Sequence, residues 1–138
     1  MADITFKYGS ENTDFLRVTA MLSESYWVPG VAEDTIRRAF ENSAVVAAGY
    51  DGDYQMCCCR AVSDKTRFAY IMDVYVDEHY RRKGYGQRML KFLLGAAELK
   101  TVRHIMLLTR DAHTFYEKVG FSLFSRPLDL LEIRKGTW

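Results

Sequence analysis

The chain has 138 residues, of which 49% are hydrophobic and 27% charged, and its formal net charge is +1. This size and composition predict one soluble globular domain, residues 1–138, with a substantial core. The balanced charge argues against nucleic-acid and membrane partners, since both attract strongly basic surfaces. We expect a cytoplasmic protein, because no segment reaches the roughly 18 apolar residues of a transmembrane helix and the N-terminus lacks a signal peptide's basic and apolar regions.

The first half of the chain alternates between strand-like and helix-like patterns. Pro29 separates two helical segments, because proline disfavours the helical conformation of the residue before it. Asp51-Gly52-Asp53 is typical of the turn of a hairpin. From residue spacing the predicted elements are strand 3–8, helices 13–25 and 32–43, and strands 45–50 and 54–62.

Three consecutive cysteines, Cys57, Cys58 and Cys59, lie in the second hairpin strand. Neighbouring cysteines rarely form a disulfide because the geometry is strained, and no Cys or His pair elsewhere completes a metal site. We therefore expect free thiols that fill small apolar positions of a strand, and no bound metal.

The second half predicts alternating strands and helices. Residues 66–76 and 103–109 are apolar and rich in strand-forming residues, which indicates two buried strands. The remaining elements are helices 86–100 and 111–121 and one or two closing strands over 121–135. The predicted order is β-α-α-β-β-β-α-β-α-β, with an optional last strand, in an α/β fold with a mixed central sheet and helices on both faces.

A basic, glycine-containing loop joins the strand over 66–76 to the next helix. Three cations directly precede Gly84 and Gly86. A helix N-terminus presents unpaired N–H groups and the positive end of the helix dipole, and glycine lets the backbone approach a ligand closely. The loop therefore suits a diphosphate. The P-loop signature is absent, and Met89 stands where the dinucleotide fingerprint has its third glycine.

The loop reads R-x-x-G-x-G and resembles motif A of the GNAT superfamily of N-acetyltransferases, whose loop holds the pyrophosphate of acetyl-CoA. "AHTFYEKVGF", residues 112–121, resembles a second segment of that family, A-x-x-x-Y-E-K-x-G-F. The resemblance is clear over 66–121. It implies a mostly antiparallel mixed sheet flanked by helices, and acetyl transfer from acetyl-CoA to an amine by direct attack.

The resemblance also implies which residues bind the cofactor. The end of the fourth strand would pair its backbone with the pantetheine arm, although its residues also suit a plain core strand. Thr109 stands where the family usually has Asn, so both a contact with the arm and a capping role are open. The implied cofactor-binding residues are Val74, Tyr75, Val76, Arg81, Arg82, Lys83, Gly84, Tyr85, Gly86, Gln87 and Thr109.

Tyr116 matches the family tyrosine that often protonates the departing thiolate of CoA, and its alternative role is packing on the sheet. A phenol with a pKa of about 10 holds its proton at neutral pH and can give it to a thiolate. Asp73 is a carboxylate in an otherwise apolar strand. It would bind or deprotonate the amine, or else be satisfied by a backbone N–H or a basic side chain. His79 and His113 are weaker titratable candidates.

Glu24, Tyr26 and Trp27 fall where the family's first-helix loop walls the acceptor pocket. A carboxylate with two aromatic rings suits a cationic amine, and it equally suits a packed corner. We therefore expect a GNAT-like acyltransferase that acts on a small-molecule or peptide amine. The alternative is a non-catalytic acyl-CoA-binding or sensing module of the same fold. The resemblance also allows a homodimer, which is common in this family.

Overall fold

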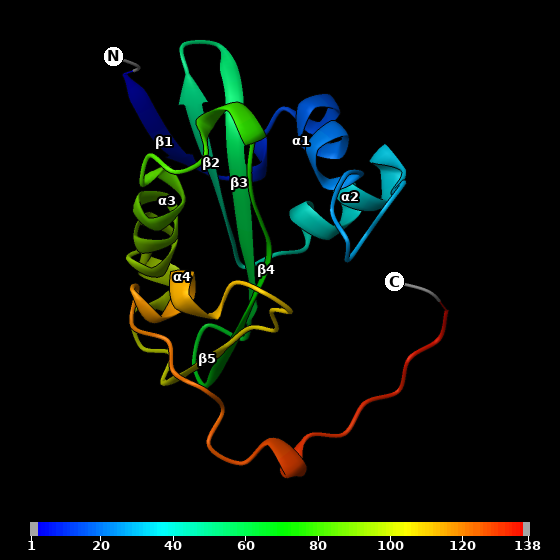
Figure 1. The fold of residues 1–138 in the computed structure, drawn as a ribbon, viewed down its shortest axis with the longest axis vertical. Helices are drawn as coiled ribbons and strands as arrows, with labels where there is room; N and C mark the ends of the chain where they lie inside the picture. The colour runs from blue at the N-terminus through cyan, green and yellow to red at the C-terminus, as the bar shows by residue number, and fades with distance from the viewer. Residues whose placement is uncertain (1–2, 137–138) are drawn as a thin grey trace.

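The computed structural model describes residues 3–136 and contains a five-stranded sheet in the order β1-β2-β3-β4-β5 (Figure 1). The strands from β1 to β4 pair antiparallel with their neighbours, whereas β4 and β5 pair parallel. The mostly antiparallel mixed sheet is thus confirmed. The strands are β1 (Ile4–Tyr8), β2 (Val45–Asp51), β3 (Tyr54–Ser63), β4 (Phe68–Val76) and β5 (His104–Met106).

Helices cover both faces of this sheet, and the three consecutive cysteines of β3 pack against both helix layers. Successive residues of a strand point to opposite faces. Cys58 packs in the core cluster of α1 and α2, whereas Cys57 and Cys59 pack in the cluster of α3. All three are fully buried and unpaired, as predicted, and burial raises the pKa of Cys57 to about 12. The helices are α1 (Phe15–Leu22), α2 (Glu33–Glu41), α3 (Tyr85–Leu94) and α4 (His113–Glu117).

Two helices begin with residues that stabilise a helix N-terminus. The Asp14 carboxylate accepts a hydrogen bond from the Arg17 amide and caps α1, and α2 carries Glu33 and Asp34 in its first turn. Helix α3 is shorter than predicted and is followed by a 3-10 turn at Ala97–Leu99. Within residues 3–136, no helix is both long and apolar enough to cross a membrane.

A bulge interrupts β4 at Asp73. The pairing of β4 with β3 changes register there, and Asp73 adopts a left-handed backbone with a φ of 56°. The side chain of Asp73 is 6% exposed. It accepts a hydrogen bond from Arg60 Nε at 2.7 Å on one oxygen and from Trp27 Nε1 at 2.9 Å on the other. Because an inserted residue bends its strand, the bulge sets the direction of β4 from Val74 onward.

Two predictions for the end of the chain are wrong. The predicted buried strand over 103–109 is limited to His104–Met106, and none of its residues is buried. Residues 121–135 form no strand and contain only a 3-10 turn at Pro127–Asp129. Among the described residues, Leu99 is the last that is buried. The first prediction rested on apolar composition, but a strand is buried only when a neighbour covers it, and β5 has no described strand on its second side.

The ion pair at the bulge leads to a stability prediction. Arg60→Met leaves the Asp73 carboxylate buried without its cation, so we expect a loss of about 3–5 kcal/mol in the free energy of unfolding. Chemical denaturation followed by circular dichroism measures the loss. The double variant Arg60→Met/Asp73→Asn should recover most of it, because Asn is uncharged and tolerates a positive φ.

A matched control is Arg37→Met, which breaks the exposed pair of Arg37 with Glu33 and should cost less than about 1 kcal/mol. Equal instability of the Arg60 single and double variants would show that an unpaired Asp73 charge is not the cause.

Candidate functional site

The strands β4 and β5 separate after a short stretch of pairing. Residues Phe68 to Tyr70 pair with His104 to Met106, and β4 then continues to Val76 without β5 beside it. The end of β4 therefore has one edge bound to β3 and one edge open among the described strands. An open edge offers backbone N–H and C=O groups to an extended ligand.

A cavity of about 960 Å³, here called the β4 cavity, lies at this open edge. It is lined by the end of β4, the start of α3, α4 and the loop after α1. Segments far apart in the sequence thus form one site. Of the predicted site residues it brings together Glu24, Tyr26, Trp27, Val74, Tyr75, Val76, Arg81, Arg82, Gly84, Tyr85, Gly86, Gln87 and Tyr116. Three predicted residues do not line it: Asp73, Lys83 and Thr109.

The N-terminus of α3 opens onto the β4 cavity. The first amide to find an intrahelical partner is that of Arg88, which donates to the Gly84 carbonyl at 3.1 Å. The N–H groups of Tyr85, Gly86 and Gln87 lie before this bond, and no described side chain caps the helix. These donors lie at the positive end of the helix, an arrangement that can bind an anion.

The two glycines of the loop serve different purposes. Gly84 has a φ of 83°, which favours glycine, and no atom lies within 4 Å of the position a Cβ would take. A Cβ on Gly86 would lie 3.1 Å from the Phe115 ring and 3.3 Å from Val76 Cγ2. Gly86 therefore lets α3 pack closely on α4 and β4, a reason that the sequence does not show.

Arg81 closes over the end of β4. Its Nε donates to the Val76 carbonyl at 2.8 Å, and its guanidinium lies 5.1 Å from the centre of the Tyr75 ring. This arginine therefore fixes the turn between the strand and the loop. The neighbouring Arg82 has a φ of 64° and lines the cavity.

Tyr116 is half-buried in α4 at the wall of the β4 cavity. Burial raises the pKa of its phenol well above the usual value, and the nearby Cys59, Tyr26 and Asp111 act in the same direction. No described residue forms a hydrogen bond with its hydroxyl. Tyr116 therefore holds its proton at neutral pH.

Tyr26 and Trp27 form the wall contributed by the loop after α1. The Tyr26 hydroxyl accepts a hydrogen bond from the Arg110 amide at 2.9 Å, and the Arg110 guanidinium lies 3.8 Å from the Tyr26 ring centre. The indole N–H of Trp27 donates a hydrogen bond to the Asp73 carboxylate, which holds the ring in place. Asp73 is thus satisfied by a basic side chain and an indole, which is one of the alternatives that its sequence position allowed.

Sequence reasoning missed two residues that shape the site. Arg110 meets Tyr26 across 84 positions of the chain, and no local pattern signals that contact. Asp77 ends β4 and accepts hydrogen bonds from Arg17, from the Tyr54 hydroxyl at 2.6 Å and from the His79 amide at 2.9 Å. Burial alone would raise the pKa of Asp77, but these bonds lower it. Asp77 stays ionised and caps the Glu78–Tyr80 turn before the loop, and an Asp directly after a strand was the available signal.

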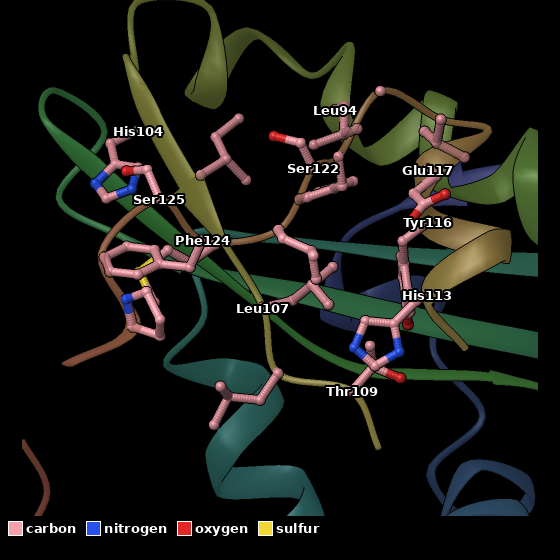
Figure 2. A pocket seen from close by; sticks show the side chains of 18 of the residues that line it. Leu94, His104, Leu107, Thr109, His113, Tyr116, Glu117, Ser122, Phe124 and Ser125 are labelled. Atoms are coloured by element: carbon pink, nitrogen blue, oxygen red, sulfur yellow. The ribbon is translucent and has the colours of Figure 1, made fainter. Parts of the chain in front are cut away.

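Thr109, His79 and His113 do not line the β4 cavity. The Thr109 hydroxyl accepts a hydrogen bond from the Ala112 amide at 3.1 Å in the turn before α4, and no described side chain caps α4 itself. Thr109 and His113 line a neighbouring cavity (Figure 2). His79 lies beside Asp77, its ring 79% exposed. Among the described residues, no group of three or more His, Cys, Asp or Glu side chains could hold a metal ion.

Comparison with protein families decides the identity of the fold. The profile of the acetyltransferase (GNAT) domain matches residues 39–123, which is more than half of the chain. The chain belongs to the GNAT acetyltransferase family. This GNAT protein is therefore an acyltransferase, and the resemblance carried by the glycine loop and the Tyr116 segment is confirmed.

Solved structures agree with this assignment. A GNAT-family protein of Xanthomonas campestris is 26% identical with a TM-score of 0.90, covering 98% of this chain and 95% of its own. A GNAT-family protein of Streptococcus pneumoniae is 23% identical with a TM-score of 0.77, covering 98% of each chain. Glucosamine-6-phosphate N-acetyltransferase of Arabidopsis thaliana is 19% identical with a TM-score of 0.64, covering 97% and 98%, and shares the fold. No curated protein sequence matches the chain.

Proposed function

We propose that this GNAT acetyltransferase moves the acetyl group of acetyl-CoA to a primary amine by direct attack. The observation that carries the proposal is the convergence of three features on the β4 cavity. They are the open edge of β4, the uncapped N-terminus of α3 and the protonated hydroxyl of Tyr116. Together they offer partners for an amide-containing arm, a diphosphate and a departing thiolate.

The first two features suit two parts of CoA, its pantetheine arm and its diphosphate. The N–H groups of Tyr85, Gly86 and Gln87 would hold the diphosphate, with Arg82 beside them on the cavity wall. Lys83 is exposed at the same loop and adds positive charge near it. Val74 and Tyr75 would pair their backbone with the amides of the pantetheine arm, as an added strand would.

The opposite wall of the β4 cavity suits a cationic acceptor. Trp27 presents an aromatic ring, and Glu24 and Asp111 add carboxylates at the same cavity. One face of the Tyr26 ring is already covered by the Arg110 guanidinium. Aromatic faces and carboxylates both attract a protonated amine. We assign Asp73 the role of holding Trp27 in this wall, since both of its oxygens accept hydrogen bonds and it does not line the cavity. The acceptor is a small-molecule or peptide amine.

Tyr116 supplies the proton that the reaction requires. The neutral amine attacks the thioester carbonyl and forms the new C–N bond. The C–S bond then breaks, and CoA leaves with the electron pair as a thiolate. The Tyr116 hydroxyl donates its proton to that sulfur, and the proton that the attacking nitrogen loses passes through solvent to the phenolate, so the products are a neutral amide and the CoA thiol. The phenol is protonated throughout the neutral range, and burial, by raising its pKa, makes it a weaker acid.

The anion site can be tested at Gly84. Gly84→Val places a branched side chain in the open space over the helix end, so we expect CoA affinity to fall about tenfold or more, roughly 1.4 kcal/mol. Isothermal titration calorimetry with CoA measures the change. Gly52→Val is the matched control, because Gly52 also has a positive φ of 59° and open space but lies in the β2–β3 turn. Equal affinities of the two folded variants would remove the loop from the CoA site.

The proton donor can be tested at Tyr116. Tyr116→Phe keeps the ring and removes the donor, so we expect turnover to fall about 10²-fold or more with little change in acetyl-CoA affinity. Steady-state CoA release is measured with acetyl-CoA and a panel of primary amines, and the best acceptor of the wild type is used for the variants.

Tyr70→Phe is the matched control for that comparison. Tyr70 is also half-buried, and its pKa is likewise raised by burial, but it lies in β4 away from the cavity. A Tyr116→Phe rate within about twofold of the wild type, under roughly 0.5 kcal/mol of barrier, would make Tyr116 a packing residue. A wild type that releases no CoA with any amine of the panel would contradict the proposed acceptor class.

A further inference from the structure

The β4 cavity has walls from both faces of the sheet. Successive residues of a strand point to opposite faces, so the end of β4 divides its side chains between the two helix layers. Val74 and Val76 pack with the core cluster of α3, whereas Tyr75 packs with the cluster of α1 and α2. Trp27, in the loop after α1, packs with the same cluster as Tyr75. The cavity therefore passes through the gap that β4 and β5 leave when they separate.

A contact between two distant loops crosses this gap. Tyr26 belongs to the loop after α1, and Arg110 follows β5, 84 positions later. The Arg110 amide donates a hydrogen bond to the Tyr26 hydroxyl at 2.9 Å, and the Arg110 guanidinium lies 3.8 Å from the centre of the Tyr26 ring. We call this contact the Tyr26–Arg110 bridge. It joins the loop that lines the cavity from the side of α1 to the loop that lines it from the side of α4.

The Tyr26 ring is held in place on several sides, although it is 42% exposed. Arg110 covers one face and binds the hydroxyl, and the Trp27 ring packs edge-on at 5.0 Å with an interplanar angle of 86°. Trp27 in turn lies against Tyr75 of β4, with ring centres 6.3 Å apart, and donates to the buried Asp73. The Tyr26 ring is thus connected to β4 on one side and to the chain after β5 on the other, which makes it a fixed part of the cavity wall.

The bridge lies on the side from which an acceptor would approach. Tyr85 at the start of α3 and Tyr116 both pack with the cluster of α3. Acetyl-CoA bound between them would occupy the α3 face of the sheet, so the amine would reach the thioester from the face of α1 and α2. Tyr26 and Trp27 line the cavity on that face. An amine on this path passes beside the Tyr26 ring, whose position the bridge fixes.

We propose that the Tyr26–Arg110 bridge selects the acceptor by its width. This inference rests on the proposed function and narrows its acceptor class. A primary amine on an unbranched carbon chain passes the fixed ring, whereas an amine on a ring carbon meets Tyr26 before its nitrogen reaches the thioester, and such a clash is a common source of specificity. Arg110 does not line the cavity and acts through Tyr26, so it is a positioning residue.

Steady-state kinetics with a matched pair of amines test the selection. n-Hexylamine and cyclohexylamine have the same number of carbon atoms and similar basicity, but the second carries its nitrogen on a ring carbon. The wild type should prefer n-hexylamine by about tenfold or more in kcat/KM. Arg110→Ala uncovers the Tyr26 ring and should reduce this preference to about threefold or less, because kcat/KM for cyclohexylamine rises. A loss of stability would lower both rates and could not produce this rise.

Arg103→Ala is the matched control, since Arg103 is an exposed arginine just before β5 that does not line the β4 cavity. It should keep the wild-type preference. A wild type that uses both amines equally well would overturn the selection by width and leave the proposed reaction standing. A preference that Arg110→Ala leaves unchanged would overturn the role of the bridge. A wild type that acetylates neither amine would overturn the proposed reaction and the selection together.

Hydrogen exchange tests the bridge without any acceptor. The Arg110 amide should exchange more slowly in the wild type than in Tyr26→Phe, which keeps the ring and removes the oxygen that accepts the hydrogen bond. Equal and fast exchange of this amide in both proteins would show that the bridge does not form, and would overturn the proposal whatever the kinetics give.

Discussion

The left-handed backbone of Asp73 is the constraint on which the site depends. Pairing of β4 with β5 ends at Tyr70, and the bulge three residues later bends the strand, so the course of its free-edged end beside the start of α3 depends on Asp73. The same carboxylate receives Arg60 from β3 and Trp27 from the loop after α1. One buried residue therefore sets the course of the end of β4 and holds Trp27 in the wall of the cavity.

The proposed CoA site consists mainly of backbone groups. The open edge of β4 and the free amides at the start of α3 are fixed before any ligand arrives, so little ordering is needed on binding. Side chains then tune this frame. Asp77 anchors the turn before the loop, Arg81 holds the Val76 carbonyl, and the tight contact at Gly86 sets the distance between α3 and α4.

The sequence predicted the parts of this structure that depend on local patterns. Alternation and spacing located the first four strands and the helices, and the glycines of the loop indicated an anion site at a helix start. Contacts between distant segments left no such pattern, as with Arg110 on Tyr26. The reason for Gly86 was also hidden, because it depends on Phe115 in another helix.

The end of the chain shows a different limit. Apolar composition predicted a buried strand over 103–109 and closing strands over 121–135, but burial depends on what covers a segment as well as on its own residues. Here β5 is at the edge of the described sheet, and the apolar residues Leu128, Leu131 and Ile133 are exposed. Alternating apolar and polar residues in 131–134 are typical of a strand, but the pattern carries no information on which strand would pair with it.

The central claim is that the open edge of β4 and the start of α3 together bind CoA. Hydrogen exchange with and without CoA tests it most directly, because both surfaces are made of backbone amides. The account predicts that CoA slows exchange at 74–76 and 82–87 and leaves 45–51 in β2 unchanged. Unchanged exchange in both binding segments under saturating CoA would contradict it. Protection confined to the amides of 104–109, in and after β5, would contradict it as well.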